Sequence, residues 1–387
     1  MTTGASLDEL RATLSEVRRA PQAKARGMPR EFYTSPAFLA LEKERIFRHE
    51  WVCLGHVGEI PNPGDYFVSS LIDEPLLVMR DGDGDVRILS NVCRHRANLL
   101  AKGKGNCAVL RCGYHAWTYA LDGRLLRAPL MDDVAQFDKT RFTLPSFQAQ
   151  VWEGFIFVNL DDNAPPLAPR LSELMPHIEH YHQEERDLLY TSEAVWRTNW
   201  KCLTENFMES YHISVTHPKT IHPYMPSARA QKIPGNDAFT AYKGGYTSSA
   251  PQRGAYHPDL TPEERRSSLL FCVFPSFVVS YAPDITIYLC LQPKSVDEVA
   301  IRWGITGYDI DPQSEEVQAY VAFCDAFNEE DRTKLEAVQR GLKSRFFTPG
   351  PLAPDNYEGT VWDFYQFMAS RLARDSTTRN THEQPPI

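Results

Sequence analysis

Two pairs of metal-binding side chains lie in the first third of the chain. Cys93 stands two residues before His95, and Cys112 stands three residues before His115, with 16 residues between the pairs. Two thiolates can hold one iron and two imidazoles the other in a two-iron, two-sulfur cluster. Tetrahedral zinc is an alternative, but zinc sites usually pair cysteine with cysteine and histidine with histidine. Because each pair here provides one of each, the spacing favours the iron cluster over zinc or a chance arrangement.

A second candidate metal site lies further along the chain. His212 and His217 are five residues apart, which on an ideal helix turns one side chain about 140° from the other. The two therefore converge only if the helix ends or unwinds after His212. The weak helix formers Val215 and Thr216, and Pro218, favour that break. With a distant carboxylate the pair would form the ligand triad of non-haem ferrous iron, whereas alone such a pair more often caps a helix or lies on the surface.

The first set is embedded in a longer motif that resembles the Rieske domain of ring-hydroxylating oxygenase large subunits. The resemblance rests on Asn-Val-Cys-Arg-His-Arg (91–96), Gly-Lys-Gly (103–105), Arg-Cys-Gly-Tyr-His-Ala-Trp-Thr-Tyr (111–119) and Leu-Asp-Gly-Arg-Leu (121–125). It implies that Cys93, His95, Cys112 and His115 bind a Rieske [2Fe-2S] cluster. That family often has proline where Gly113 stands and glycine where Ala116 stands, so this chain departs from it beside the ligands.

The histidine pair resembles the catalytic motif of the same family over residues 199–218. The resemblance implies that His212 and His217 bind the mononuclear iron and that Asn206 lies near it. It implies that Glu209 hydrogen-bonds His212 and a cluster histidine of a neighbouring subunit, with His115 as the expected partner. Helical spacing would place Glu209 and His212 on one face. Without this motif, Glu209 would be interpreted as a solvated helix residue.

The third iron ligand must come from a distant part of the chain. The stretch 328–342 resembles the C-terminal helix from which the family takes a carboxylate, and Asp331 is the matching position. Glu329, Glu330 and Asp325 are close competitors, and a charged helix start is the structural alternative.

The resemblance implies a terminal oxygenase that uses dioxygen and NAD(P)H-derived electrons, delivered by a reductase with or without a ferredoxin. It also implies a head-to-tail homotrimer and hydroxylation or oxidative demethylation of a small substrate. The sequence is most similar to the branch that oxidises the quaternary ammonium compounds choline, glycine betaine, carnitine and proline betaine. Such a cation needs an aromatic or acidic pocket. The candidates, each of which could instead be strand core, are Phe207, Phe274, Phe277, Tyr281 and Tyr288.

Three other functions remain as alternatives. Hydroxylation or O-demethylation of an aromatic compound would favour an arginine in the pocket. A pure electron carrier of the Rieske ferredoxin type needs only about a hundred residues. It would leave the expected catalytic region, about 220 residues, unexplained. A zinc-stabilised interaction protein would be colourless, whereas a Rieske protein is brown-red.

The elements that must position these residues follow from periodicity and turns. Helices are expected at 6–20, with Ser6 and Glu9 as the cap, and at 36–49. Short apolar runs between turn signals predict an all-β unit from about 51 to 160. After it, helices are expected at 170–184, 199–211 and 313–343, strands at 271–308, and a fraying tail at 374–387.

The expected fold class is therefore α+β. N-terminal helices (1–45) would pack on the catalytic domain, an all-β Rieske domain (46–162) would follow, and a helix-grip-like catalytic domain with a central antiparallel sheet (163–387) would complete the chain. The helix-grip-like shape of the catalytic domain is what the resemblance to the oxygenase family implies.

Composition limits the remaining possibilities. The formal net charge is -9 without a long basic run, which argues against binding nucleic acid through phosphates. We expect no membrane segment and no signal peptide, hence a cytoplasmic protein whose eight cysteines are reduced.

Overall fold

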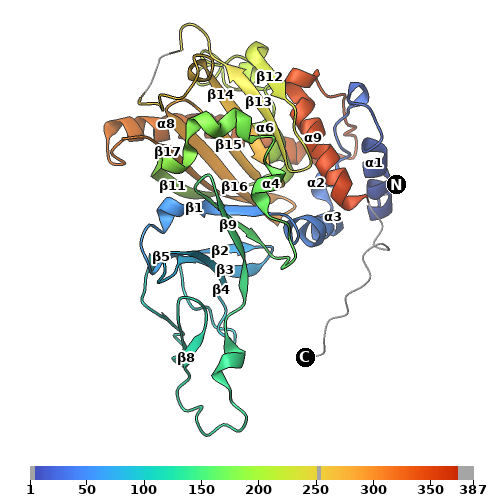
Figure 1. Cartoon of the computed structure of the whole chain (residues 1–387). Helices are drawn as coiled ribbons and strands as arrows, with labels where there is room; N and C mark the ends of the chain where they lie inside the picture. The colour runs from blue at the N-terminus through green and yellow to red at the C-terminus, as the bar shows by residue number, and fades with distance from the viewer. Residues whose placement is uncertain (1–4, 251–253, 374–387) are drawn as a thin grey trace.

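The computed structural model describes residues 5–250 and 254–373, and two large antiparallel sheets dominate it (Figure 1). The first sheet belongs to the expected all-β unit and has the order β1-β10-β9-β4-β3-β2-β5. Its strands are β1 (Val52–His56), β10 (Phe155–Asn159), β9 (Ser146–Trp152), β4 (Val86–Ser90), β3 (Glu74–Arg80), β2 (Asp65–Leu71) and β5 (Lys104–Asn106). A small sheet of β6 (Leu110–Arg111), β7 (Thr118–Tyr119) and β8 (Leu125–Arg127) extends from it.

The second sheet forms the centre of the larger domain. Its order is β11-β17-β16-β15-β14-β13-β12, and each neighbouring pair is antiparallel. The strands are β11 (Asp187–Trp196), β17 (Glu298–Gly307), β16 (Ile285–Ser295), β15 (Phe277–Tyr281), β14 (Ser267–Val273), β13 (Phe239–Gly245) and β12 (Ala230–Ile233). The expected strands at 271–308 are therefore present.

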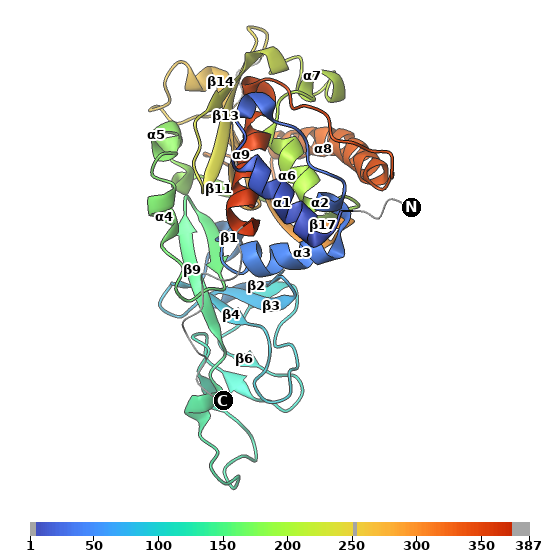
Figure 2. The same cartoon turned by 90° about the vertical axis from the view of Figure 1, so that its right-hand side faces the viewer.

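Both faces of this second sheet are buried, each in a different core. On β14, Leu270 and Cys272 belong to the core beneath the helices, whereas Phe271 belongs to the core shared with β10 and the segment 167–181. Successive side chains of a strand point to opposite faces, so one residue of register decides which core a side chain enters. Figure 2 shows the longer helices on one side of this sheet, and both Figures 1 and 2 show the all-β unit below it.

Five longer helices surround this sheet or its neighbours. They are α1 (Leu7–Val17), α3 (Pro36–Glu42), α6 (Trp200–Met208), α8 (Glu315–Leu342) and α9 (Asp355–Leu372). The expected capping box of Ser6 and Glu9 is present, and α1 packs against α9. No described helix is both long and apolar enough to cross a membrane. The predicted tail at 374–387 lies outside the described residues.

Two helix predictions were wrong in extent. The helix expected at 36–49 is α-helical only to Glu42 and continues as a π-helical turn, Lys43–Phe47. The helix expected at 170–184 is broken into α4 (Leu167–Arg170), α5 (Met175–Ile178) and the 3-10 turns Glu179–Tyr181 and Gln183–Glu185. Pro169 and Pro176 remove backbone donors there, and His182 is left-handed with φ 40°.

The remaining helical pieces are single turns. They are α2 (Glu31–Thr34), α7 (Ile213–Thr216) and the 3-10 turns Gln22–Lys24, Val57–Glu59, Lys139–Phe142, Ser227–Arg229 and Glu264–Arg266.

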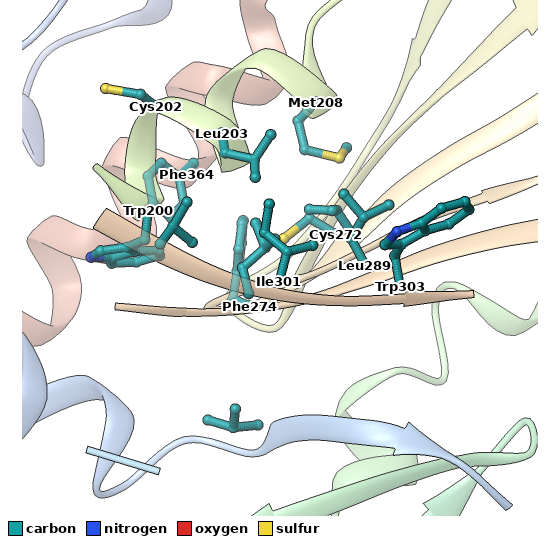
Figure 3. Close-up of a cluster of buried hydrophobic side chains, with 14 of the residues drawn as sticks. Trp200, Cys202, Leu203, Met208, Cys272, Phe274, Leu289, Ile301, Trp303 and Phe364 are labelled. Carbon is teal, nitrogen blue, oxygen red and sulfur yellow. The ribbon is translucent and has the colours of Figure 1, made fainter. Parts of the chain in front are cut away.

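Helix α6, which leads into the histidine motif, is held rigidly. Asn199 caps it by accepting a hydrogen bond from the Lys201 N–H. Leu203 and Met208 point from the helix onto the sheet, where they meet side chains such as Leu289 (Figure 3). The buried ammonium of Lys201 lies 2.6 Å from the Glu42 carboxylate. Removing one partner of such a pair typically costs about 3–5 kcal/mol, so this contact fixes where α6 begins.

Candidate metal centres and substrate cavity

His212, His217 and Asp331 converge in the large domain. The Nε2 atoms of the two histidines are 3.2 Å apart. Asp331 Oδ1 on α8 lies 3.0 Å from His217 Nε2 and 3.6 Å from His212 Nε2. This oxygen is buried and has no hydrogen-bond partner among the described residues. A buried, unsatisfied carboxylate oxygen facing two imidazoles suits a cation, so the three side chains fit the ligand set of ferrous iron.

The helix before the two histidines ends earlier than the sequence predicts. Helix α6 ends at Met208, and Glu209 is already extended (φ -120°, ψ 152°). The break therefore lies before Glu209 rather than after His212, and Glu209 and His212 do not share a helical face. The single turn α7 separates the histidines, and His217 leaves helical geometry at φ -112° and ψ 49°. Pro218, which disfavours helix at the preceding residue, is the physical reason.

A carboxylate orients each histidine from behind. Glu209 Oε1 lies 2.5 Å from His212 Nδ1, and Glu209 Oε2 accepts the His212 N–H at 3.0 Å. Glu330 Oε2 lies 2.8 Å from His217 Nδ1 and also accepts from the Thr220 hydroxyl. Both imidazoles are thus bound at Nδ1 and present Nε2, the arrangement in which carboxylates position metal-bound histidines.

The competing carboxylates on α8 are occupied elsewhere. Glu330 contacts His217 Nδ1 rather than the Nε2 side. Glu329 forms an ion pair with Arg332 at 2.5 Å, and Asp325 lines a separate small pocket with them. In the described chain, Asp331 is the α8 carboxylate that lies near both Nε2 atoms. Burial alone would lower the pKa of His212, but the carboxylates of Glu209 and Asp331 outweigh it and raise that pKa.

The four predicted cluster residues also come together, at the opposite end of the molecule. The His95 and His115 rings are 4.6 Å apart, and the Nδ1 atom of each is buried without a hydrogen-bond partner in the described chain. Cys93 and Cys112 are close enough to share a hydrogen bond. Two adjacent thiols facing two unsatisfied imidazole nitrogens fit a two-iron cluster with mixed ligation.

The surroundings of these residues favour ligation. Burial, with the neighbouring His115 and Arg96, lowers the pKa of His95, which favours the neutral imidazole that a metal binds. Cys93 Sγ lies 3.3 Å from the Tyr119 hydroxyl, and Asn98 Nδ2 donates to Cys112 Sγ at 3.6 Å. Hydrogen bonds to the sulfurs are one of the means by which a protein sets the potential of a cluster.

One departure from the family has a structural consequence. Ala116, where the family often has glycine, adopts φ 57°. A left-handed conformation costs a residue with a Cβ about 1–2 kcal/mol, whereas glycine adopts it freely.

We expect Ala116→Gly to raise the stability of the cluster-bearing loop, because the strain at φ 57° disappears. The gain should be about 1 kcal/mol, partly offset by the greater chain entropy of glycine in the unfolded state. Bleaching of the visible cluster absorption on heating measures it. Ala128→Gly is the matched control, because Ala128 is not among the residues with positive φ, and an equal gain there would contradict the explanation.

A cavity opens beside the three iron-site residues. Asn206, Phe207 and the triad line it, as do residues that the sequence reasoning missed: Tyr224, Tyr242, Tyr246, Tyr256, Arg265 and Asp284. Strand alternation was the available signal for part of the wall, because Ser280 on β15 and Ile287 on β16 are cross-strand neighbours that both face the cavity. The tyrosines, apart from Tyr242 on β13, lie in loops that no periodicity marks.

Four of the five aromatic residues expected in the pocket do not line it. Phe277, Tyr281 and Tyr288 point to the opposite face of the sheet, where they pack in the core shared with the all-β unit. Successive side chains of a strand point to opposite faces of the sheet, and these three occupy the positions that point away from the cavity. Phe274 lies against α9, where its ring stacks on Phe367 at 4.6 Å between ring centres. Phe207 alone of the five lines the cavity.

Besides Asp331 of the triad, the cavity wall carries one cationic side chain, Arg265, and one further anionic side chain, Asp284. The Arg265 guanidinium lies 4.9 Å from the Tyr256 ring and donates to the Pro258 carbonyl at 2.9 Å. Its buried Nε has no hydrogen-bond partner, and no described carboxylate forms an ion pair with it. Asp284 is 6 % exposed and accepts from the Tyr320 hydroxyl at 2.8 Å.

Comparison with known proteins finds two family matches along the chain. Residues 50–138 match the Rieske [2Fe-2S] domain, and residues 177–374 match the catalytic domain of the ring hydroxylating alpha subunit. The carnitine monooxygenase oxygenase subunit of Acinetobacter pittii is 30% identical over 330 residues, covering 82% of this chain and 85% of the relative. The glycine betaine monooxygenase oxygenase subunit of Pseudomonas aeruginosa (strain UCBPP-PA14) is 27% identical over 392 residues, covering 92% and 91%.

Solved structures share the fold. The quaternary ammonium Rieske monooxygenase CntA has a TM-score of 0.82 at 24% identity, covering 97% of this chain and 100% of that one. Naphthalene 1,2-dioxygenase from Rhodococcus sp. also reaches 0.82, at 22% identity and with 96% and 100% covered. The expected α+β fold, its Rieske β domain and the antiparallel catalytic sheet are confirmed, as is the likeness to the quaternary ammonium branch. The chain therefore belongs to the ring-hydroxylating oxygenase alpha-subunit family and is a Rieske non-haem iron oxygenase.

Proposed function

We propose that this chain is the terminal oxygenase of a multicomponent system that hydroxylates or N-demethylates a small quaternary ammonium compound bearing a carboxylate. Cys93, His95, Cys112 and His115 would hold the [2Fe-2S] cluster, and His212, His217 and Asp331 would hold the iron. When bound, the cluster supplies electrons and the ferrous iron supplies the centre for activating dioxygen. Family members work with a reductase, and we propose one that draws on NAD(P)H, with or without a ferredoxin.

The protein's own groups would orient and insulate this chemistry. Glu209 and Glu330 hold the two imidazoles at Nδ1, so that Nε2 of each faces Asp331. His217 is fully buried, and Phe327 packs on it at 6.4 Å between ring centres, which keeps bulk water from that side. Asn206 lines the cavity and would act on substrate or water beside the metal.

We propose a head-to-tail homotrimer in which Glu209 links His212 to a cluster histidine of the adjacent subunit. The supporting observation is the separation of the two sites within one chain. The turn α7, between the iron-site histidines, and β6, next to Cys112, lie at opposite ends of the molecule (Figure 2). Fast electron transfer over such a separation needs a shorter route through a neighbouring chain.

The substrate class rests on the wall of the cavity. Four tyrosines and Asp284 suit a quaternary ammonium group, which binds aromatic faces and carboxylates. Arg265, with an unsatisfied Nε and no described carboxylate partner, suits a substrate carboxylate. Together they favour a zwitterion of the betaine or carnitine type over choline, which has no carboxylate. The carnitine and glycine betaine relatives act on such compounds by name.

Arg265 also supports a second candidate, hydroxylation or O-demethylation of an aromatic acid. Such a substrate would use the arginine and the aromatic wall but would gain nothing from Asp284. Screening oxygen uptake with the reduced enzyme against betaines and aromatic acids tests the proposal. Turnover of aromatic acids with none of the betaines would replace it.

We expect Arg265→Gln to raise the KM for a zwitterionic substrate by about 10–100-fold, the cost of losing a charge-assisted contact of about 1.5–3 kcal/mol. The KM for choline, if choline is turned over at all, should change little, because it makes no carboxylate contact. Arg48→Gln is the control, since Arg48 pairs with Glu44 on the surface. Equal loss with both substrates would show that Arg265 acts through packing.

A further inference from the structure

A second cluster of metal-binding side chains lies on the surface of the large domain. We call it the outer histidine cluster: His182, Glu185, His257 and Asp259. His182 and Glu185 belong to the broken helical segment before β11, and His257 and Asp259 belong to the loop before β14. The centres of the two imidazole rings lie 3.8 Å apart, and the rings are tilted by 32° to each other. None of these four residues belongs to the proposed iron site.

The ring nitrogens of the cluster divide into two sets. His182 Nδ1 and His257 Nε2 lie 3.7 and 3.9 Å from the Glu185 carboxylate. One ligand atom from each of these three residues lies within 4.8 Å of the other two. Atoms bound to one tetrahedral zinc are about 3.3–3.5 Å apart. Small side-chain movements, with Glu185 exposed and free to rotate, would therefore bring these three atoms to bonding positions.

The other two nitrogens face Asp259. His182 Nε2 lies 2.8 Å and His257 Nδ1 3.6 Å from Asp259 Oδ2. A carboxylate that holds the outward nitrogens of two histidines fixes their tautomers and directs the remaining nitrogens to a metal. Binding at His257 Nε2 would leave the proton on Nδ1. That nitrogen would then donate to the Asp259 carboxylate instead of accepting the Asp259 N–H, now at 3.3 Å.

The surrounding charge favours a cation. Glu153 and Glu184 share a hydrogen bond next to His182. Burial and the nearby Glu184 raise the pKa of Glu153 to about 7. Four carboxyl groups, those of Glu153, Glu184, Glu185 and Asp259, thus lie around two imidazoles. The Arg186 guanidinium is directed away onto Thr286 and two carbonyl oxygens.

We propose that His182, His257 and Glu185 bind a divalent transition metal of the zinc type, with Asp259 orienting both histidines. Two imidazoles, one carboxylate and a water complete a tetrahedral zinc shell, and the partial exposure of the cluster leaves the metal a route in. The site is separate from the iron triad and does not depend on the proposed substrate.

The position of the cluster gives the metal a mechanical role. His257 follows Tyr256, which lines the substrate cavity and lies under the Arg265 guanidinium. A metal shared by His257 and His182 would tie the loop 254–260 to the segment before β11. It would thereby hold Tyr256 and Arg265 in place at the cavity wall.

Zinc titration of the full-length, iron-loaded protein, with calorimetry and a metal count, tests this site. We expect one zinc per chain to bind without loss of iron. His182→Asn and His257→Asn should each weaken binding more than about tenfold, and Asp259→Asn about 10–100-fold, as for other outer carboxylates. In the wild type, but not in the His182 and His257 variants, zinc should also slow hydrogen–deuterium exchange in residues 254–260.

The matched control is His49→Asn, which removes a surface histidine paired with one carboxylate, Asp161, at 2.9 Å. It should bind zinc like the wild type. Three results would overturn the proposal: no bound zinc, unchanged affinity in the His182 and His257 variants, or zinc that enters only as iron leaves. Zinc binding that leaves exchange at 254–260 unchanged would overturn the tie to the loop.

Discussion

His212→Ala is expected to lower the iron content from three to two atoms per chain and to abolish turnover. The variant removes one of the two imidazole nitrogens that face Asp331, and the remaining His217 and Asp331 cannot enclose the metal. The loss of one ligand should leave the cluster intact, because its four residues lie at the other end of the molecule. Iron analysis, visible absorption and low-temperature EPR of the reduced protein measure both centres.

His49→Ala serves as the control, because it removes a histidine–carboxylate pair of the same chemistry on the surface. It should retain three irons and full turnover. A bleached cluster in His212→Ala, or retention of three irons, would show that the iron is held elsewhere.

Glu209→Gln is expected to keep both metal centres but to slow electron transfer between them by about 10–100-fold, the usual effect of removing an orienting carboxylate. Glu209 holds His212 at two points, the ring Nδ1 at 2.5 Å and the backbone N–H at 3.0 Å. Glutamine keeps the shape but replaces one oxygen by an NH2 group, which cannot accept from the imidazole or the backbone. It also removes the charge that raises the pKa of His212.

Single-turnover oxidation of the reduced cluster, followed by its visible absorption, measures this rate. Glu44→Gln, a surface carboxylate paired with Arg48, is the control. Because iron content is measured on the same sample, slower transfer with iron retained separates the bridging role from loss of metal. An unchanged rate with both centres present would remove Glu209 from the electron path.

Much of the functional chemistry could be predicted from short motifs. The proposed ligands of the cluster lie within 23 residues of one another. Turn-forming residues dictate the local loops that carry them, and tertiary contacts need only dock these loops. The same holds for His212 and His217, where Pro218 forces the chain out of helical geometry. The all-β unit, α1 with its capping box, and α8 were predictable because period and turn signals agree there.

Other features depend on the packed structure. The sequence offers Asp325, Glu329, Glu330 and Asp331 as neighbours on one helix, and only the rotation of α8 against α6 and α7 directs Asp331 to the Nε2 side and Glu330 to the Nδ1 side. The aromatic wall was mispredicted for a related reason. In a sheet buried on both faces, apolar residues alternate without a polar face to mark direction, so Phe277, Tyr281 and Tyr288 could not be assigned to a core until the sheet packed.

The short motifs of the amino-acid sequence thus determined which residue types provide the predicted ligands, because ligand spacing and turn chemistry are local. Tertiary structure decided which carboxylate faces which nitrogen, which aromatic residues meet the cavity, and that His182 meets His257 across 75 positions of the chain. Those outcomes depend on the packing of elements that are distant in sequence. In the sheet, for example, a one-residue change in register would move the aromatic residues to the opposite face.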